Sequence, residues 1–380
     1  MSTLLPLGVR DSRYYFEDGS IIILAERTLF KIHRSLLSLH SDVFESMFKL
    51  PGHRISDEST SPIDDEGGSD RNPVIIPEIK ASQLRTFLLY IYGTATNPEY
   101  RALIQAATEE SANSLVALRR YLDVASLAHR FCLEDIESWA LDQLKKLLQF
   151  SRKLSELSWS YSDMIDTLTY SKLTCDHEIQ QHLRSLVYRS VCKLYILCST
   201  YSDLKKPSTV YVISRFTQLF IHPTIKQDDP ALFGLVFCLA LSAGHRSLIW
   251  QNMTRDERAK LYAAQVHLTP LPPKLPLVWL KNHVEPFYRS LMEECPECFM
   301  SCSEKFFKDA NPVVNRADLT SDSPLMGIRA LCKLPLQRQQ LESLKTSYQC
   351  ACPTKILEMA YLSLDKSFKE LGEKYQDCLV

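Results

Sequence analysis

Residues 14–48 read YYFEDGSIIILAERTLFKIHRSLLSLHSDVFESMF, and this stretch decides the fold of the first part of the chain. A run of β-branched and aliphatic residues, Ser20 to Ala25, follows the turn-forming dipeptide Asp18-Gly19, so the pattern predicts a β-hairpin. Thr28 to Ile32 then alternates apolar and polar residues, as a half-buried strand does. The stretch therefore predicts strands that lead directly into helix.

Two short helices are predicted after these strands. Leu36, Leu37 and Leu39 begin the first. The second begins at Asp42, whose carboxylate can cap backbone N–H groups, with Glu45 three residues later. Its apolar stripe consists of Phe44, Met47 and Phe48.

The composition is that of an ordinary globular protein. The chain has 380 residues, which predicts two or three domains. It is 45% hydrophobic and 23% charged, and its net charge of -1 argues against a dedicated nucleic-acid binder or a membrane-surface protein. The sequence contains no G-x-x-x-x-G-K, H-E-x-x-H or G-x-S-x-G motif. We therefore predict no catalytic residues, no bound cofactor and no small-molecule substrate.

The sequence also indicates a compartment. The N-terminus lacks the charged start and apolar core of a signal peptide. The longest apolar run, Ala231 to Gly244, is shorter than the roughly 20 residues that cross a bilayer and predicts a buried helix. Without a secretion signal, most of the twelve cysteines are expected to be reduced core thiols. These features predict a cytoplasmic or nuclear protein.

The first domain is expected to span residues 12–150. Within it, residues 51–73 combine Pro, Gly, Ser and acidic residues and predict a disordered, solvated insertion. A brief strand at Val74–Pro77 and a helix over Ser82–Tyr92 follow. Two further helical faces close the domain: Leu118, Tyr121, Leu122, Ala125 and Ala128, then Leu133, Ile136, Ala140, Leu144 and Leu147.

Three motifs in this order carry a resemblance to a known family: FKIHRSLLSLHSDVFESMF, PEIKASQLRTFLLYIYGT and YLDVASLAHRFCLEDIESWALDQL. Together they resemble the BTB/POZ domain, most closely its fungal branch, over about residues 12–150. The resemblance implies an α+β domain in which a small sheet is capped by helices. It also implies homodimerisation, hetero-oligomerisation or binding of a partner such as a cullin scaffold or a transcriptional corepressor, without catalysis.

The chain departs from the family in two respects. Many cullin-binding members carry a short hydrophobic-x-Glu element, and no clear copy of it lies between Lys49 and Ile79. The arm before Arg13 is also short, which argues against a strand-swapped dimer.

We predict that the association surface is apolar and is formed by the Phe16–Leu24 hairpin and the adjacent helix. The candidate surface residues are Phe16, Ile21, Ile23, Phe44 and Phe48. His33 has no nucleophile beside it in the sequence and is expected to be a packed, hydrogen-bonded histidine.

The remainder of the chain predicts helices. A mainly α-helical region over 151–267 has apolar residues at helical spacing, and a proline-rich linker over 268–276 separates it from a helical C-terminal region, 277–380. No kelch, ankyrin or leucine-rich periodicity recurs, so a substrate-receptor architecture is unsupported. The five predicted helices of the first region are Met164–Tyr170, Ile179–Tyr195, Val210–Phe220, Leu232–Ala243 and Arg255–His267.

Four cysteines in the C-terminal region are candidate metal ligands: Cys295, Cys298, Cys350 and Cys352. A tetrahedral zinc ion needs four thiolate or imidazole ligands, and C-x-x-C brings two sulfurs to one metal. The second pair has the tighter C-x-C spacing, so free core thiols remain the alternative to a structural zinc, and a redox dithiol is a further one. A closed four-sulfur site would stabilise the fold and leave no open position for catalysis.

The C-terminus carries a short heptad pattern. Leu357, Tyr361, Leu364, Phe368, Leu371 and Tyr375 recur at spacings of four and three. The pattern is shorter than the three to four heptads that indicate a coiled coil. It therefore favours a helix docked on its own domain, with a second association surface as the alternative.

These patterns predict a non-enzymatic protein-interaction module that mediates homo- or hetero-oligomerisation through an N-terminal BTB/POZ domain. The alternatives are an adaptor for a cullin-type ubiquitin ligase or a transcriptional corepressor and, less compatible with the motifs, a metal-dependent enzyme.

Overall fold

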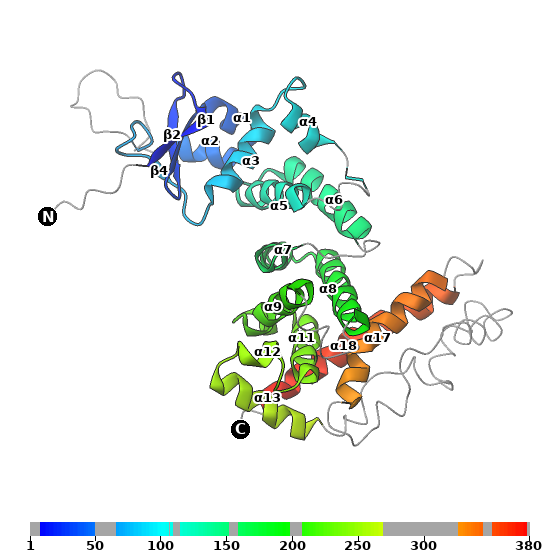
Figure 1. Ribbon diagram of the computed structural model, residues 1–380. Helices are drawn as coiled ribbons and strands as arrows, with labels where there is room; N and C mark the ends of the chain where they lie inside the picture. The colour runs from blue at the N-terminus through cyan, green and yellow to red at the C-terminus, as the bar shows by residue number, and fades with distance from the viewer. Residues whose placement is uncertain are drawn as a thin grey trace. The chain divides into compact units, whose positions relative to one another are not determined.

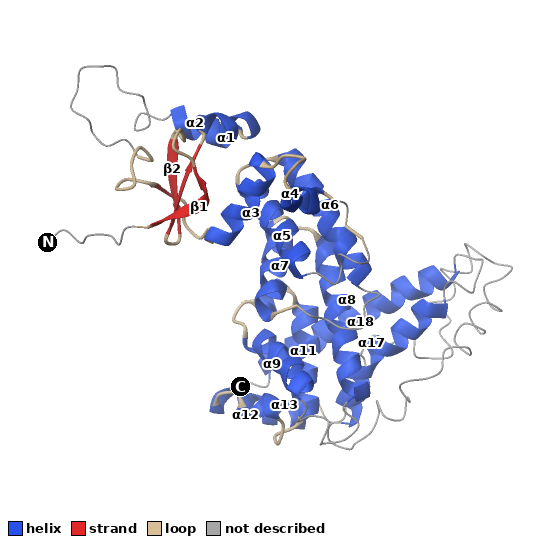
Figure 2. Cartoon of the chain, turned by 45° about the horizontal axis from the view of Figure 1, so that its top comes forward, coloured by secondary structure: helices blue, strands red, loops and turns tan. Residues whose placement is uncertain are grey.

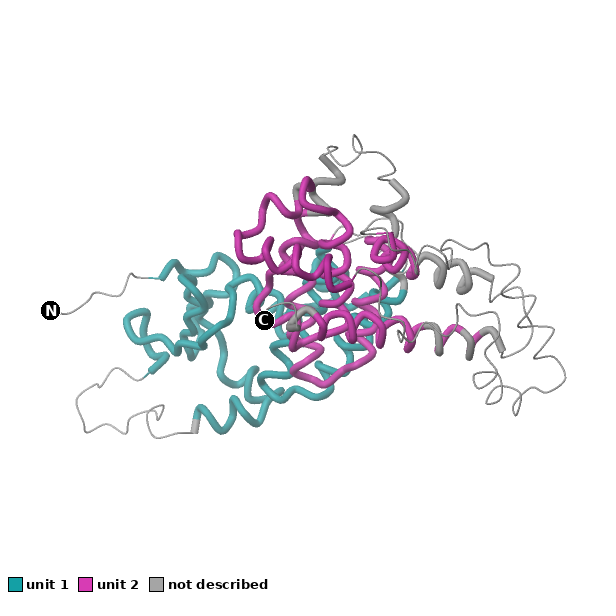
Figure 3. The backbone as a smooth tube through the Cα atoms, turned by 90° about the horizontal axis from the view of Figure 1, so that it is seen from below, with its two compact units in different colours: residues 1–154 teal, residues 155–380 magenta. Residues whose placement is uncertain are grey.

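The computed structural model describes residues 8–49, 66–105, 107–108, 115–151, 159–197, 207–268, 326–344 and 352–377. The chain divides into two compact units, residues 1–154 and 155–380, shown in different colours in Figure 3. The first unit contains a small sheet and helices, whereas the described part of the second consists of helices. An α+β N-terminal domain followed by a mainly helical region is thereby confirmed.

A β-hairpin lies at the centre of the sheet. Strand β2 (Ile21–Ala25) pairs antiparallel with β3 (Thr28–Ile32), with Ile23 opposite Phe30. The turn at Glu26 is tight enough to place this residue at a φ of 54°. Both strands bury most of their apolar side chains, since β-branched and aromatic residues fill a pleated surface well.

The hairpin predicted about Asp18-Gly19 is wrong in its pairing. Strand β1 (Val9–Tyr15) pairs parallel with β3 and not with β2, and β4 (Val74–Ile75) pairs parallel with β2. The strand order is β1-β3-β2-β4. The turn before Gly19 instead carries the chain across the end of β3, where a Cβ on Gly19 would lie 2.9 Å from the Lys31 backbone. The glycine permits this close crossing.

Of the helices described in the first unit, all but α4 form where the apolar spacing predicts them (Figure 1). Both predicted faces of the closing helix pair are buried, and α3 packs on α5, which packs on α6. Gly93 follows the last residue of α3. Glycine fits at this position because a Cβ there would lie 1.9 Å from the Tyr100 ring. The six helices in the described part of this unit are α1 (Arg34–His40), α2 (Asp42–Lys49), α3 (Ala81–Tyr92), α4 (Pro98–Ile104), α5 (Leu115–Arg130) and α6 (Glu134–Ser151).

The predicted acidic insertion lies partly outside the described residues, but its end is visible. The Ile22 N–H donates to the Gly67 carbonyl at 2.8 Å, and the Gly67 N–H donates to the Asn72 carbonyl at 2.6 Å. Residues 66–73 are thus tied to the edge of the sheet, which corrects the expectation of disorder for this part of the insertion. Polar composition alone did not reveal these long-range backbone partners.

The second unit is built around one apolar helix, α11 (Pro230–Ala243). Its residues from Ala231 to Ser242 are all buried, and α8, α9, α17 and α18 pack against it. The predicted buried helix is confirmed. None of the helices in the described ranges combines the length and apolar character that a membrane crossing needs.

The other helices in the described part of this unit are, except for α10, labelled in Figures 1 and 2. They are α7 (Tyr161–Leu173), α8 (His177–Leu197), α9 (Pro207–Ile221), α10 (Ile225–Asp228), α12 (Leu248–Gln251), α13 (Arg255–His267), α17 (Met326–Leu344) and α18 (Cys352–Asp377).

The C-terminal helix α18 packs within its own unit. The described positions of its predicted seam, Leu357, Tyr361, Leu364, Phe368 and Leu371, are buried, and α18 contacts α11 and α17. Gly234 of α11 allows a close crossing, because a Cβ on it would lie 1.8 Å from the Phe368 carbonyl oxygen. Helices from both predicted regions, 151–267 and 277–380, therefore pack together, while nearly all of the predicted linker lies outside the described residues.

Candidate functional site

The two short helices after the hairpin, α1 and α2, are held to the body of the first unit through Ser41. Ser41 lies between the helices in extended backbone, and its Oγ donates to the Phe131 carbonyl at 2.7 Å. The same Oγ accepts from the Phe44 N–H at 3.3 Å, as an N-cap residue does. The predicted cap of α2 therefore belongs to Ser41 and not to Asp42.

The inner side of this helix pair is anchored by aromatic packing. The Phe44 ring lies 4.4 Å from the Phe131 ring between centroids, and Phe131 lies 5.9 Å from Phe87 of α3. Leu37 of α1 is also buried. Burial of such rings contributes more than their area alone, since tilted aromatic pairs add about 0.5–1.5 kcal/mol. The inner side is therefore rigidly supported.

The outer side of α1 and α2 exposes apolar side chains. Leu39 is 73% exposed and Val43 is 40% exposed, whereas Met47 and Phe48 are half-buried. The Arg34 guanidinium lies 5.5 Å from the centre of the Phe48 ring. We name Leu39, Val43, Met47 and Phe48 the α1–α2 surface. Because these apolar residues belong to two consecutive short helices, they are a candidate contact site.

The predicted association surface is corrected at three positions. Ile21 and Ile23 of β2 and Phe44 of α2 lie in the core. Phe16 and Phe48 are half-buried and accessible. Sequence reasoning missed Leu39 and Val43 as surface residues. Leu39 follows the buried Leu37 by two positions, which is about 200° around a helix, so this spacing could have placed it on the outer side.

Phe16 belongs to an aromatic cluster at the end of the sheet. Its ring stacks on Tyr92 at 5.1 Å and lies 5.3 Å from His33. The His33 backbone N–H donates to the Tyr92 hydroxyl at 2.8 Å, and His33 Nε2 lies 3.3 Å from Asp18 Oδ2. The predicted packed, hydrogen-bonded histidine is thereby confirmed. Burial raises the pKa of Tyr92, and the hydrogen bond to His33 lowers the pKa of Asp18.

Side chains along strand β1 form hydrogen bonds and ion pairs with other parts of the first unit. Asp11 is buried and accepts from Arg85 Nε of α3 at 2.5 Å and from the Tyr14 N–H at 2.9 Å. Burial opposes ionisation of Asp11, but these hydrogen bonds and the guanidinium outweigh it and lower its pKa. The Tyr15 hydroxyl donates to Asp70 Oδ1 at 2.6 Å. Two ion pairs, Arg10–Asp70 and Arg13–Glu99, complete the attachment.

These contacts give β1 a firm place at one edge of the sheet. Edge strands with charged side chains resist the addition of a further strand. The charged side chains of β1 therefore disfavour the addition of a further strand at this edge. Sequence reasoning missed β1, because its buried positions include an aspartate.

The candidate metal ligands are not brought together in the described part of the chain. Cys295, Cys298 and Cys350 lie outside the described residues, and Cys352 begins α18 without a described side chain. Within the described ranges, no group of three or more His, Cys, Asp or Glu residues could hold a metal ion. The structural zinc therefore stays a prediction, which elemental analysis of the purified protein tests.

Comparison with known proteins gives one match. Residues 17–137 match the family model of the BTB/POZ domain, within the predicted span of 12–150. No curated protein matches the chain significantly, and no solved structure does. The matched residues contain the β2–β3 hairpin, β4 and the helices from α1 to the start of α6, in the order that the three motifs predict. The BTB/POZ domain is a protein–protein interaction domain, and residues 17–137 of this chain form one.

Proposed function

We propose that this chain is a non-enzymatic assembly protein that associates with further copies of itself through the α1–α2 surface. The observation that carries the proposal is the exposure of Leu39 and Val43 on helices whose inner side is fixed by Ser41 and Phe44. A rigid apolar surface loses little conformational freedom when it is buried. The family resemblance adds support, since it implies homodimerisation.

A two-fold dimer is the commonest form of self-association. In such a dimer the same patch occurs on both subunits, so each exposed side chain is buried twice. Burying one leucine contributes about 2 kcal/mol, so losing Leu39 from both sides removes roughly 3–4 kcal/mol. Because 1.4 kcal/mol is a tenfold change in affinity, we expect a dimer weakened by more than about 100-fold.

Sedimentation velocity of the full chain over a range of concentrations tests this proposal. We expect reversible association of the wild-type protein, and a monomer for Leu39→Glu at the same concentrations. Val116→Glu is the matched control, since Val116 is an exposed apolar residue, 57% exposed, on α5 of the same unit. A wild-type monomer throughout, or an equal loss of association in both variants, would refute self-association through this surface.

Binding of a cullin scaffold or a transcriptional corepressor is the alternative that the resemblance leaves open. A pull-down of the full chain with a cullin tests the adaptor role directly. Retention that Leu39→Glu abolishes would assign the same surface to a different protein, and no retention would remove the adaptor role.

A further inference from the structure

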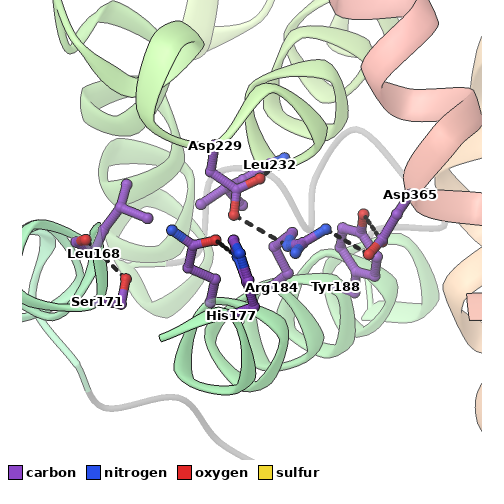
Figure 4. Close-up of polar contacts among 9 residues, drawn as sticks. Leu168, Ser171, His177, Arg184, Tyr188, Asp229, Leu232 and Asp365 are labelled. Atoms are coloured by element: carbon purple, nitrogen blue, oxygen red, sulfur yellow. Dashed lines mark hydrogen bonds and ion pairs between the residues drawn. The ribbon is translucent and has the colours of Figure 1, made fainter. Parts of the chain in front are cut away.

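A buried ionic cluster joins three helices of the second unit (Figure 4). Arg184 of α8 lies at its centre, with Nε 3.0 Å from Asp229 Oδ2 and Nη1 2.5 Å from Asp365 Oδ2. The Tyr188 hydroxyl donates to Asp365 Oδ1 at 2.7 Å. Asp229 precedes α11, and its Oδ1 accepts from the Leu232 N–H at 3.0 Å, so it is the N-cap of that helix.

The cluster places two carboxylates on one guanidinium. The Asp229 side chain is only 4% exposed, and those of Arg184 and Asp365 are 16% and 19% exposed. Ionised Asp229 and Asp365 therefore repel each other in a region that water reaches poorly. One charge in the cluster is left uncompensated by Arg184.

Charged groups on the surrounding helices also have partners, and Glu373 of α18 lines a hollow together with Lys226 and Pro230. On α7 and α10, Lys172 forms an ion pair with Asp228, and Lys226 lies over the Phe233 ring. On α9, Arg215 donates to the Trp159 carbonyl, and on α17 Arg329 donates to the Ser242 carbonyl near the other end of α11. On α8, His182 lies 3.5 Å from Glu178, and His177 lies within hydrogen-bonding distance of Gln180.

The charge at Asp229 responds to this environment. Burial raises the pKa of Asp229 to about 6, and Asp365 adds to this, while Arg184 and the N–H groups at the start of α11 oppose it. Asp365 belongs to α18. The repulsion between Asp365 and Asp229, and part of the burial of Asp229, therefore depend on whether α18 is docked. If α18 leaves, Asp229 keeps Arg184 without competition and gains access to water.

We propose that docking of the C-terminal helix α18 is linked to protonation of the Asp229 carboxyl, so that acid tightens the docked helix and neutral pH loosens it. Docking favours the protonated carboxyl because it removes water and adds a second carboxylate. By reciprocity, a proton on Asp229 favours docking to the same extent. Undocking exposes the apolar seam of α18, including Leu364 and Phe368, together with the α11 face that it covers.

The direction and size of the pH effect on docking follow from the linkage between proton binding and docking. The docked state has the higher pKa, so the proton contributes to docking fully at low pH and its contribution is lost as the pH rises through about 6. If undocked Asp229 returns to its ordinary value of 3.8, the undocked population rises at most about tenfold between roughly pH 5 and 7.5.

Hydrogen–deuterium exchange of the full chain tests the proposal, with rates corrected for the intrinsic effect of pH. We expect opening of α18 to become up to about tenfold more frequent over this pH range, while α13 shows no such trend. Asp229→Asn is expected to abolish the trend, because asparagine keeps the N-cap and cannot ionise. Asp365→Asn is expected to reduce it, which provides a second variant should the first fold poorly. Asp256→Asn, at an exposed site on α13, is the matched control and should retain the trend.

Two outcomes overturn the proposal. One is α18 opening that is independent of pH in the wild-type protein. The other is an unchanged trend in both Asp229→Asn and Asp365→Asn. Neither outcome bears on self-association through the α1–α2 surface, which lies in the other unit.

Discussion

Local helix propensity and the packing of α18 predict opposite effects on stability when Gly234 is replaced by alanine. Alanine stabilises a helix interior by about 1 kcal/mol relative to glycine. A Cβ at this position, however, lies 1.8 Å from the Phe368 carbonyl oxygen and 2.5 Å from its carbonyl carbon. These are backbone atoms of α18, so no side-chain rotation relieves the overlap.

The size of the effect follows from this geometry. Real Cβ contacts are not shorter than 3.0 Å, so α11 and α18 must separate by at least 1.2 Å at this crossing, the difference between 3.0 and 1.8 Å. Overpacking of this kind costs about 3 kcal/mol, at the upper end of its usual range. After the gain in helix propensity, we expect Gly234→Ala to lower the free energy of unfolding by about 2 kcal/mol.

Urea unfolding of the full chain, followed by far-ultraviolet circular dichroism, measures this change. Gly372→Ala is a graded comparison, because its Cβ would meet the Phe233 ring at 3.1 Å and the Pro230 carbonyl at 3.2 Å. We expect a smaller loss there. An increase in stability for Gly234→Ala would refute the close crossing and, with it, the docking of α18 described above.

Three further predictions concern the first unit. Ser41→Ala removes the cap of α2 and the bond to the Phe131 carbonyl, so we expect about 1–2 kcal/mol of destabilisation in urea unfolding. Because the pKa of Asp11 is lowered in the folded protein, its contribution to stability is present above about pH 3.8 and is lost as the pH falls further. In a pH series of thermal unfolding, Asp11→Asn should therefore lose less stability at acid pH than the wild-type protein. An equal loss in both proteins would contradict this prediction. Cys132 has a φ of 53°, so Cys132→Gly should raise the free energy of unfolding by up to about 1 kcal/mol, whereas a loss would show that the thiol contributes to packing.

The helices could be predicted from the sequence because their apolar spacing reports directly on burial. The face of α5 that begins at Leu118 and the face of α6 that begins at Leu133 are both buried as the 3.6-residue period requires. The apolar spacing of α18 also predicts a buried face. Only the contacts of α18 with α11 show that this face packs within its own unit. A heptad pattern describes a helix that needs a partner and does not identify that partner.

The sheet and the candidate site were less predictable, for physical reasons. Strand β1 buries Asp11, and a buried aspartate interrupts the alternation on which strand prediction depends. Core and contact residues are chosen from the same apolar types, so Ile21 and Leu39 are alike in sequence although one is buried and the other exposed. The Arg184–Asp365 pair joins residues 181 positions apart, a separation that no local pattern encodes.

The central claim is that the α1–α2 surface is where copies of this chain meet. Hydrogen–deuterium exchange of the full chain at concentrations below and above the association midpoint tests it most directly. We expect amides of residues 34–49 to gain protection as the concentration rises, while those of α5 around Val116 do not change. Protection that is independent of concentration, or that grows at β1 or β4 instead, would contradict the claim.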